Sequence, residues 1–270
     1  MSTTIGRAAA LIYGILCYAA FLVVFLYAIG FVTGIGVPRT VDHGIDSSVA
    51  EAIVVNLGLL GAFAIPHSVM ARPGFKKRWT RIVSPAIERS TYVLVSSALL
   101  GLLFWQWRTL DATVWHVGPP AVRAAIWVVA AAGWVTVVAS TFMLSHFELF
   151  GLRQVFDTWR SGKPHGENHF RTPLLYRLVR HPLMLGFVVA FWAAPTMTAG
   201  HLLFAAASTA YILVALRFEE RDLIATLGDQ YRRYRGEVPM LIPHPTQALR
   251  RSPRLSSSSR SDSLSPPQIP

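Results

Sequence analysis

Several histidines, arginines and glutamates in this sequence lie where an apolar run meets a polar segment. They are His67, His146, Glu148, Arg180, His181, Arg217, Glu219 and Glu220. A neutral imidazole accepts protons near neutral pH, guanidinium binds carboxylates, and carboxylates accept hydrogen bonds from hydroxyl and amino groups. Ionisable groups at the edge of apolar segments are candidates for a functional site. Each of them alone is also compatible with a snorkelling group that anchors a helix end.

The Arg180-His181-Pro182 sequence predicts the start of a helix. Proline suits the first helical position, where its missing N–H costs nothing. The exposed N–H groups and the dipole of a helix start favour an anion, so this end can hold a carboxylate.

A second charged motif follows the last apolar run. Arg217, Glu220 and Arg221 lie three and four positions apart, so they share one face of a helix. Glu219 lies to one side of that face. The pattern indicates either part of a site or a surface ion pair. The basic and aromatic run 231–235 fits an amphipathic helix on anionic lipid, and equally a cover over the site.

The composition places these residues in a membrane protein. Of the 270 residues, 53% are hydrophobic and 14% are charged, with a mean hydropathy of +0.42. An ordinary soluble domain has about 25% charged residues. Cys17 is the one cysteine, which excludes an intramolecular disulfide. The net charge of +11 is not gathered on a soluble module with groove-reading elements, so we expect no nucleic-acid partner.

Apolar windows of about 20 residues predict the elements that carry the charged groups. Full spans are expected at about 9–33, 50–70, 91–106 and 122–145. The next apolar stretch is interrupted by Pro195, which predicts two segments, about 182–194 and 198–218, in a hairpin that does not quite span the membrane. The predicted fold class is therefore all-α, a polytopic membrane helical bundle of four full spans plus a proline-broken hairpin, with five to six membrane segments.

The distribution of Lys and Arg predicts the orientation. The connections 71–90 and 146–181 are rich in both, whereas 34–49 and 107–121 carry one arginine each. By the positive-inside rule, the basic connections and both termini are cytoplasmic, and the charged groups meet at the cytoplasmic boundary of the bilayer. Near the other boundary, an aromatic belt is expected from Trp105, Trp107 and Trp115.

Two regions differ in composition. Residues 1–246 are expected to form one membrane domain, whereas 247–270 are rich in Ser, Pro and Arg and are expected to be a disordered tail. The oligomeric state is left open by the sequence.

Absent motifs narrow the chemistry. The sequence has no G-x-G-x-x-G, P-loop, G-x-S-x-G, H-E-x-x-H or paired C-x-x-C motif, so common nucleotide folds, serine hydrolases, zinc proteases and zinc ribbons lack support. His67 and His146 form a pair that can ligate haem iron or another transition metal if their helices face each other. That alternative stays open.

Residues of about 171–243 carry a set of motifs: RHPLMLG at 180–186, RFEERDL at 217–223 and GDQYRRY at 228–234. Their order, with a broken apolar hairpin after the first, resembles the C-terminal region of the isoprenylcysteine carboxyl methyltransferase and phospholipid methyltransferase superfamily. Those integral-membrane enzymes use S-adenosylmethionine. The resemblance implies a cofactor site formed by Arg180, His181, Pro182, Gly186, Arg217, Glu219 and Glu220. Met184 departs from the superfamily motif, which often has tyrosine there.

A narrower resemblance covers the chain to about residue 245. HSVMARPGFK at 67–76, ERSTY at 88–92 and HFELFGL at 146–152 resemble the bacterial membrane methanethiol S-methyltransferases, which make dimethyl sulfide. It implies an S-adenosylmethionine-dependent thiol methyltransferase in the inner membrane of a bacterium. The alternatives are another thiol, a prenyl-cysteine or a lipid as acceptor, or a haem-binding isomerase or accessory protein, because the nitrite and nitric oxide reductase accessory proteins share parts of the pattern.

The expected reaction needs a base and no metal. The thiolate is the effective nucleophile and alkyl thiols are mostly protonated at neutral pH, so a group near the boundary must take the proton. His146 is the first candidate, with Glu148 as its orienting or charge partner, and His67 is the second. Attack of a thiolate on a methyl sulfonium annihilates charge, which a dry, apolar pocket favours.

Overall fold

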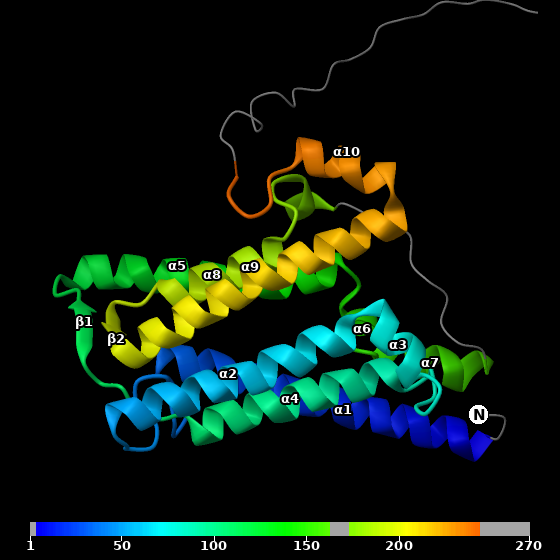
Figure 1. Ribbon diagram of the computed structural model, residues 1–270, viewed down its shortest axis with the longest axis horizontal. Coiled ribbons are helices and arrows are strands. Elements are labelled where there is room, and N and C mark those ends of the chain that lie inside the picture. Colours follow the sequence, from blue (N-terminus) through cyan, green and yellow to red (C-terminus); the bar gives the residue numbers. More distant parts are fainter. Residues whose placement is uncertain (1–3, 163–172, 244–270) are drawn as a thin grey trace, which may run out of the picture.

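A computed structural model describes residues 4–162 and 173–243 (Figure 1). Its elements in order are α1 (Thr4–Thr33), α2 (Val49–Ala71), α3 (Pro73–Trp79), α4 (Glu88–Gln106), β1 (Thr113–His116), α5 (Pro120–Met143), α6 (His146–Leu149), α7 (Leu152–Ser161), the 3-10 helix η1 (Leu174–Arg177), α8 (Pro182–Trp192), β2 (Thr196–Thr198), α9 (Ala199–Leu227) and α10 (Asp229–Glu237). The predicted all-α membrane bundle is confirmed. The expected tail, 247–270, lies outside the described residues.

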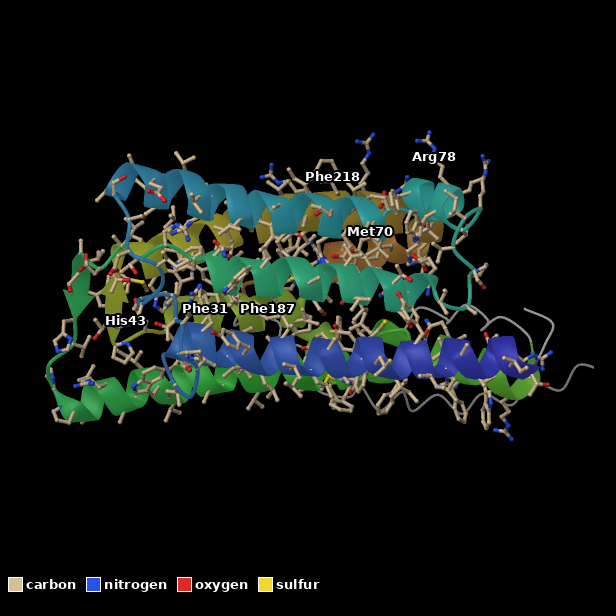
Figure 2. All side chains as sticks on the ribbon, turned by 90° about the horizontal axis from the view of Figure 1, so that it is seen from below. Phe31, His43, Met70, Arg78, Phe187 and Phe218 are labelled. Carbon is tan, nitrogen blue, oxygen red and sulfur yellow. The ribbon has the colours of Figure 1, made fainter. Side chains whose placement is uncertain are left out.

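The long helices form two layers (Figure 1). In one layer α4 packs against both α1 and α2, and in the other α8 packs against both α5 and α9. Contacts of α2 with α9, and of Phe25 with Trp134, join the layers. Phe31 belongs to the buried core and Phe187 packs against that core (Figure 2).

Four of the described helices, α1, α2, α5 and α9, are long and apolar enough to cross a membrane. Large apolar side chains such as Leu16, Val23 and Val128 are exposed on them, a surface that lipid stabilises and water does not. The chain is an integral membrane protein. The span expected at 91–106 forms α4, which begins with the polar run Glu88–Thr91 and is not among these four.

The hairpin prediction was right for α8 and wrong for α9. α8 has 11 residues and is too short to cross, whereas α9 has 29 residues and continues well beyond residue 218. The chain breaks around Pro195 as expected, and β2 then pairs antiparallel with β1. The continuation includes Arg217–Asp222, where Arg180 forms an ion pair with Glu220.

The charged connections lie together at one end of the bundle. α3, α6, α7 and α10 gather at this end, opposite β1 and β2 (Figure 1). Arg78 of α3 and His43 lie at opposite ends (Figure 2). The expected aromatic belt was wrong for Trp107, which is fully buried and donates its indole N–H to the Val41 carbonyl at 3.0 Å.

Two glycines let α5 and α8 approach closely. A Cβ added to Gly186 would lie 2.7 Å from the Gly133 carbonyl oxygen and 2.9 Å from the Val137 nitrogen. Small residues allow such backbone contact between membrane helices. The two helices run in opposite directions, so one turn further Thr141 of α5 comes level with Pro182 of α8. Gly186, expected near a cofactor, therefore has a packing role.

We predict that Gly186→Ala lowers the thermal unfolding temperature of the detergent-purified protein. The added methyl group must push two backbones apart, an overpacking cost of about 1–3 kcal/mol. Gly58→Ala in α2 is the matched control, because nothing lies within 4 Å of a Cβ there. The control should unfold at or above the original temperature, since alanine is the better helix former. Equal unfolding temperatures for the two variants would contradict this account of the α5–α8 crossing.

Candidate functional site

Glu220 of α9 is the centre of a buried ion-pair cluster, defined here as Arg180, His181, Glu219 and Glu220. Its Oε1 accepts a hydrogen bond of 2.7 Å from Arg180 Nε and lies 3.2 Å from His181 Nε2. Arg180 Nη1 also donates to the carbonyls of Arg235 and Val238, at 2.9 and 2.6 Å. The side chains of Arg180 and Glu220 are both only 9% exposed. A pair buried to this degree is stable only when such additional hydrogen bonds surround it.

The other members of the cluster differ in exposure. His181 directly precedes α8, its side chain is buried, and its Nδ1 lies 4.0 Å from Glu219 Oε2. Glu219 is 47% exposed, so its carboxylate is accessible. Arg217 is exposed and is not part of the buried pair. The structure therefore brings together four of the predicted residues and leaves Arg217 on the surface.

α10 covers this cluster. The backbone N–H groups of Arg180 and His181 donate to the carbonyls of Pro239 and Met240, directly after α10. Tyr234 donates its hydroxyl to the Tyr176 carbonyl at 2.6 Å. Burial raises the pKa of Tyr234 to about 12, against the opposing effect of Arg180, so the phenol stays protonated. Of the two interpretations of the 231–235 run, the structure supports the cover.

A strained turn positions His146. Ser145 adopts a left-handed backbone with φ of 75°, uncommon outside glycine, between α5 and α6. The turn folds His146 back onto α5, where its ring stacks on Phe142 with a centroid distance of 4.3 Å. His146 Nδ1 lies 2.8 Å from Thr141 Oγ1, and Nε2 lies 2.7 Å from the Tyr18 hydroxyl of α1. We call Tyr18, Thr141 and His146 the His146 triad.

The hydrogen bonds of the triad fix the tautomer of His146. Thr141 donates its own proton to the Val138 carbonyl at 2.7 Å, so its oxygen accepts from His146 Nδ1–H. Nε2 then carries the lone pair and accepts from the Tyr18 hydroxyl. Burial lowers the pKa of His146 below its usual value, which keeps the ring neutral. Because hydroxyls occupy both ring nitrogens, this geometry does not favour His146 as a haem ligand.

Glu148 was expected to be the orienting or charge partner of His146, but other groups bond the ring nitrogens of His146. The hydroxyls of the triad, rather than the Glu148 carboxylate, occupy the ring nitrogens of His146. Glu148 instead lines a polar cavity of about 300 Å³ together with Lys76, Glu88 and Arg89. Burial, with the neighbouring Arg89, lowers the pKa of Lys76.

His67 belongs to another set of contacts, made by α2 and α4. Its Nδ1 lies 3.1 Å from Ser96 Oγ, its Nε2 lies 3.1 Å from the Tyr92 hydroxyl, and its ring stacks on Phe63. One turn further, Arg72 forms a 2.8 Å ion pair with Asp222, which ties α2 to α9. The contacts of His146 come instead from α1, α5 and α6.

The His146 triad and the ion-pair cluster lie at the same end of the α5–α8 pair. Thr141 comes level with Pro182, so the last turn of α5 is beside the first turn of α8. The sequence analysis did not identify Tyr18 and Thr141, which complete the triad. Tyr234 and Arg235 lie in the 231–235 run, for which a cover over the site was one of the two interpretations. Hydroxyl groups inside apolar helices carry little signal in a sequence, and the Thr141–His146 bond depends on the left-handed turn at Ser145.

Comparison with known proteins identifies relatives along nearly the whole chain. A family model described as NnrU protein matches residues 55–219. A methanethiol S-methyltransferase from Mycobacterium tuberculosis is 65% identical over 87% of this chain and 96% of that protein. One from Pseudomonas deceptionensis is 47% identical over 92% and 93%. Nurim from Mus musculus is 27% identical over 66% and 70%. No solved structure matches.

We predict that Glu220→Gln unfolds at a clearly lower temperature than the unsubstituted protein. Removing one charge of a buried pair leaves Arg180 uncompensated, at a cost of about 3–5 kcal/mol. Glu219→Gln, at the adjacent and half-exposed position, is the matched control and should change the unfolding temperature little. Thermal unfolding in detergent measures both. If Glu220→Gln is as stable as its control, the pair does not hold α10 in place.

Proposed function

The chain belongs to the NnrU protein family and to the family of the methanethiol S-methyltransferases, and from this premise we propose that it transfers a methyl group to methanethiol. The product of that transfer is dimethyl sulfide. Similarity along almost the full length of enzymes with this name carries the proposal. The ion-pair cluster and the His146 triad lie at one end of the bundle. They supply the binding and proton-accepting residues that the methyl transfer requires.

We propose S-adenosylmethionine as the methyl donor, held by the ion-pair cluster. This molecule carries a carboxylate, an ammonium group, ribose hydroxyls and a sulfonium, and the cluster offers groups of matching chemistry. Arg180, His181 and the N–H groups of the first turn of α8 suit the carboxylate. The accessible Glu219 suits the ammonium or ribose, and the α10 tyrosines Tyr231 and Tyr234 suit the sulfonium cation. Bound there, S-adenosylmethionine supplies the electrophilic methyl group.

His146 is the proposed base. Its neutral ring, with the lone pair fixed on Nε2, accepts the proton that the thiol must lose. Thr141 then accepts from Nδ1–H in both protonation states of the ring, so no reorientation is needed during the transfer. Phe142, Phe147 and Phe150 surround the imidazole with apolar rings. Such surroundings exclude water and suit a small, polarisable sulfur compound.

The orientation completes the proposal. We place the end with α3, α6, α7 and α10 in the cytoplasm of a bacterium, where S-adenosylmethionine is made, and the bundle in its inner membrane. α3 carries Lys76, Lys77 and Arg78, which fits the positive-inside rule. Both termini are then cytoplasmic, residues 1–246 form one membrane domain, and 171–243 contain most of the cofactor site.

Membranes that contain this protein should form dimethyl sulfide when both S-adenosylmethionine and methanethiol are added. Headspace gas chromatography measures the product, with membranes from an empty-vector strain as the control. Omission of either compound should abolish formation. A folded protein that makes no dimethyl sulfide would reject methanethiol as the acceptor, and larger thiols, prenyl-cysteine and lipid would then be tested by transfer of a labelled methyl group from S-adenosylmethionine.

Two substitutions should separate binding from turnover. His181→Ala should abolish S-adenosylmethionine binding in calorimetry on detergent-purified protein, whereas His146→Ala should keep it and lose about 10²–10⁴-fold in kcat. Because burial lowers the pKa of His146, the acid limb of kcat/KM should lie below pH 6.5. Thermal unfolding controls for folding. Unchanged affinity in His181→Ala, or full turnover in His146→Ala, would remove the corresponding role.

A further inference from the structure

Tyr18 is the residue of α1 whose side chain forms a hydrogen bond with His146. Its hydroxyl lies 2.7 Å from His146 Nε2, and its ring lies edge-on to the imidazole. α1 comes from the other layer of the bundle, so this contact joins the two layers at the end where the site lies. An apolar residue of similar shape would pack equally well against the neighbouring phenylalanines. Packing alone therefore does not explain the hydroxyl group of Tyr18.

The tautomer of His146 makes Tyr18 the group at the basic nitrogen. Nδ1–H is directed at Thr141, whose own proton is directed at the Val138 carbonyl. Nε2 is consequently the one nitrogen that can take up a proton, and the Tyr18 hydroxyl occupies its lone pair. A thiol reaches this lone pair only through the tyrosine or by displacing it.

Exposure favours the route through the tyrosine. His146 is buried under Phe142, Phe147 and Phe150, whereas Tyr18 is only partly buried. The ring of Tyr18 lies among Phe21, Phe147 and Phe150, with centroid distances of 6.1 to 6.3 Å. A small apolar thiol can approach along this aromatic surface and meet the phenol before the imidazole.

We propose that Tyr18 is a catalytic residue that relays the thiol proton to His146, an inference that rests on the proposed function. The thiol transfers its proton to Tyr18 Oη while the original Tyr18 proton moves to His146 Nε2. The sulfur then carries the electron pair of the broken S–H bond and forms the new S–CH₃ bond. The S–CH₃ bond of the sulfonium breaks, and its electron pair stays on the departing sulfur. Tyr18 ends neutral, and His146 ends as an imidazolium whose Nδ1–H is held by Thr141.

The α1 helix offers a matched control for this relay. Tyr13 lies five positions before Tyr18 and its hydroxyl also makes one hydrogen bond between helices, 3.1 Å from Thr91 Oγ1 of α4. Tyr13→Phe and Tyr18→Phe each remove one hydroxyl from α1 and one interhelical hydrogen bond. A purely structural role for these hydroxyls predicts similar effects of the two substitutions.

The kinetic test compares methanethiol with hydrosulfide in a mildly alkaline buffer. Hydrosulfide is smaller than methanethiol and already ionised there, so it fits the site and needs no base. Tyr18→Phe should lose about 100-fold in kcat with methanethiol, the lower end of acid–base contributions, and remain near the original rate with hydrosulfide. Tyr13→Phe should have the same kcat as the unsubstituted protein with both methanethiol and hydrosulfide. An equal loss with both acceptors, or full activity with methanethiol, would overturn the relay.

A second test needs no turnover. In protein labelled with ¹⁵N-histidine, the His146 signals are identified by their loss in His146→Ala. The unsubstituted protein and Tyr13→Phe should show an Nδ1–H ring with a hydrogen-bonded Nε2, and Tyr18→Phe should shift Nε2 to the value of a free lone pair. An unchanged Nε2 in Tyr18→Phe would reject the contact and the relay with it. Absence of dimethyl sulfide from the unsubstituted protein would instead reject the proposed function.

Discussion

The close approach of α5 and α8 determines how the rest of the site is arranged. Gly133 and Gly186 remove the side chains that would separate the two backbones, and this contact fixes the register of the helices. Because they run in opposite directions, the last turn of α5 lies beside the first turn of α8. The His146 triad is formed at the end of α5, and the ion-pair cluster is formed at the start of α8. Two groups built from segments far apart in the chain thereby share one end of the bundle.

A second constraint acts on both groups, since a buried polar group must be hydrogen-bonded. Glu220 satisfies this requirement with charges, because Arg180 and His181 bond its carboxylate and backbone carbonyls bond Arg180 in turn. His146 satisfies it with neutral hydroxyls. The first solution produces a charged cluster covered by α10, whereas the second produces an uncharged histidine surrounded by aromatic rings.

The sequence was informative where residue type alone limits the structure. Apolar length predicted α1, α2 and α5, and the Arg180-His181-Pro182 sequence predicted the start of α8. It was less informative where tertiary contacts decide. Whether Glu219 or Glu220 faces inward depends on the rotation of α9. The indole N–H of Trp107 can be buried because the Val41 carbonyl accepts it, and Tyr18 approaches His146 because α1 packs close to the segment that follows α5. Such contacts join segments far apart in the chain, so local pattern does not reveal them.

The two kinds of environment match the two demands of the proposed reaction. A charged, polyfunctional donor needs ionic and hydrogen-bonding partners to be held, and the ion-pair cluster is built from these. Transfer of its methyl group to a thiolate destroys a positive and a negative charge together, so polar surroundings at the sulfur would stabilise the reactants more than the transition state. Aromatic rings around a neutral histidine of fixed orientation avoid that cost. A single polar cleft would meet the first demand and oppose the second, whereas the proposed roles of the cluster and the triad meet both.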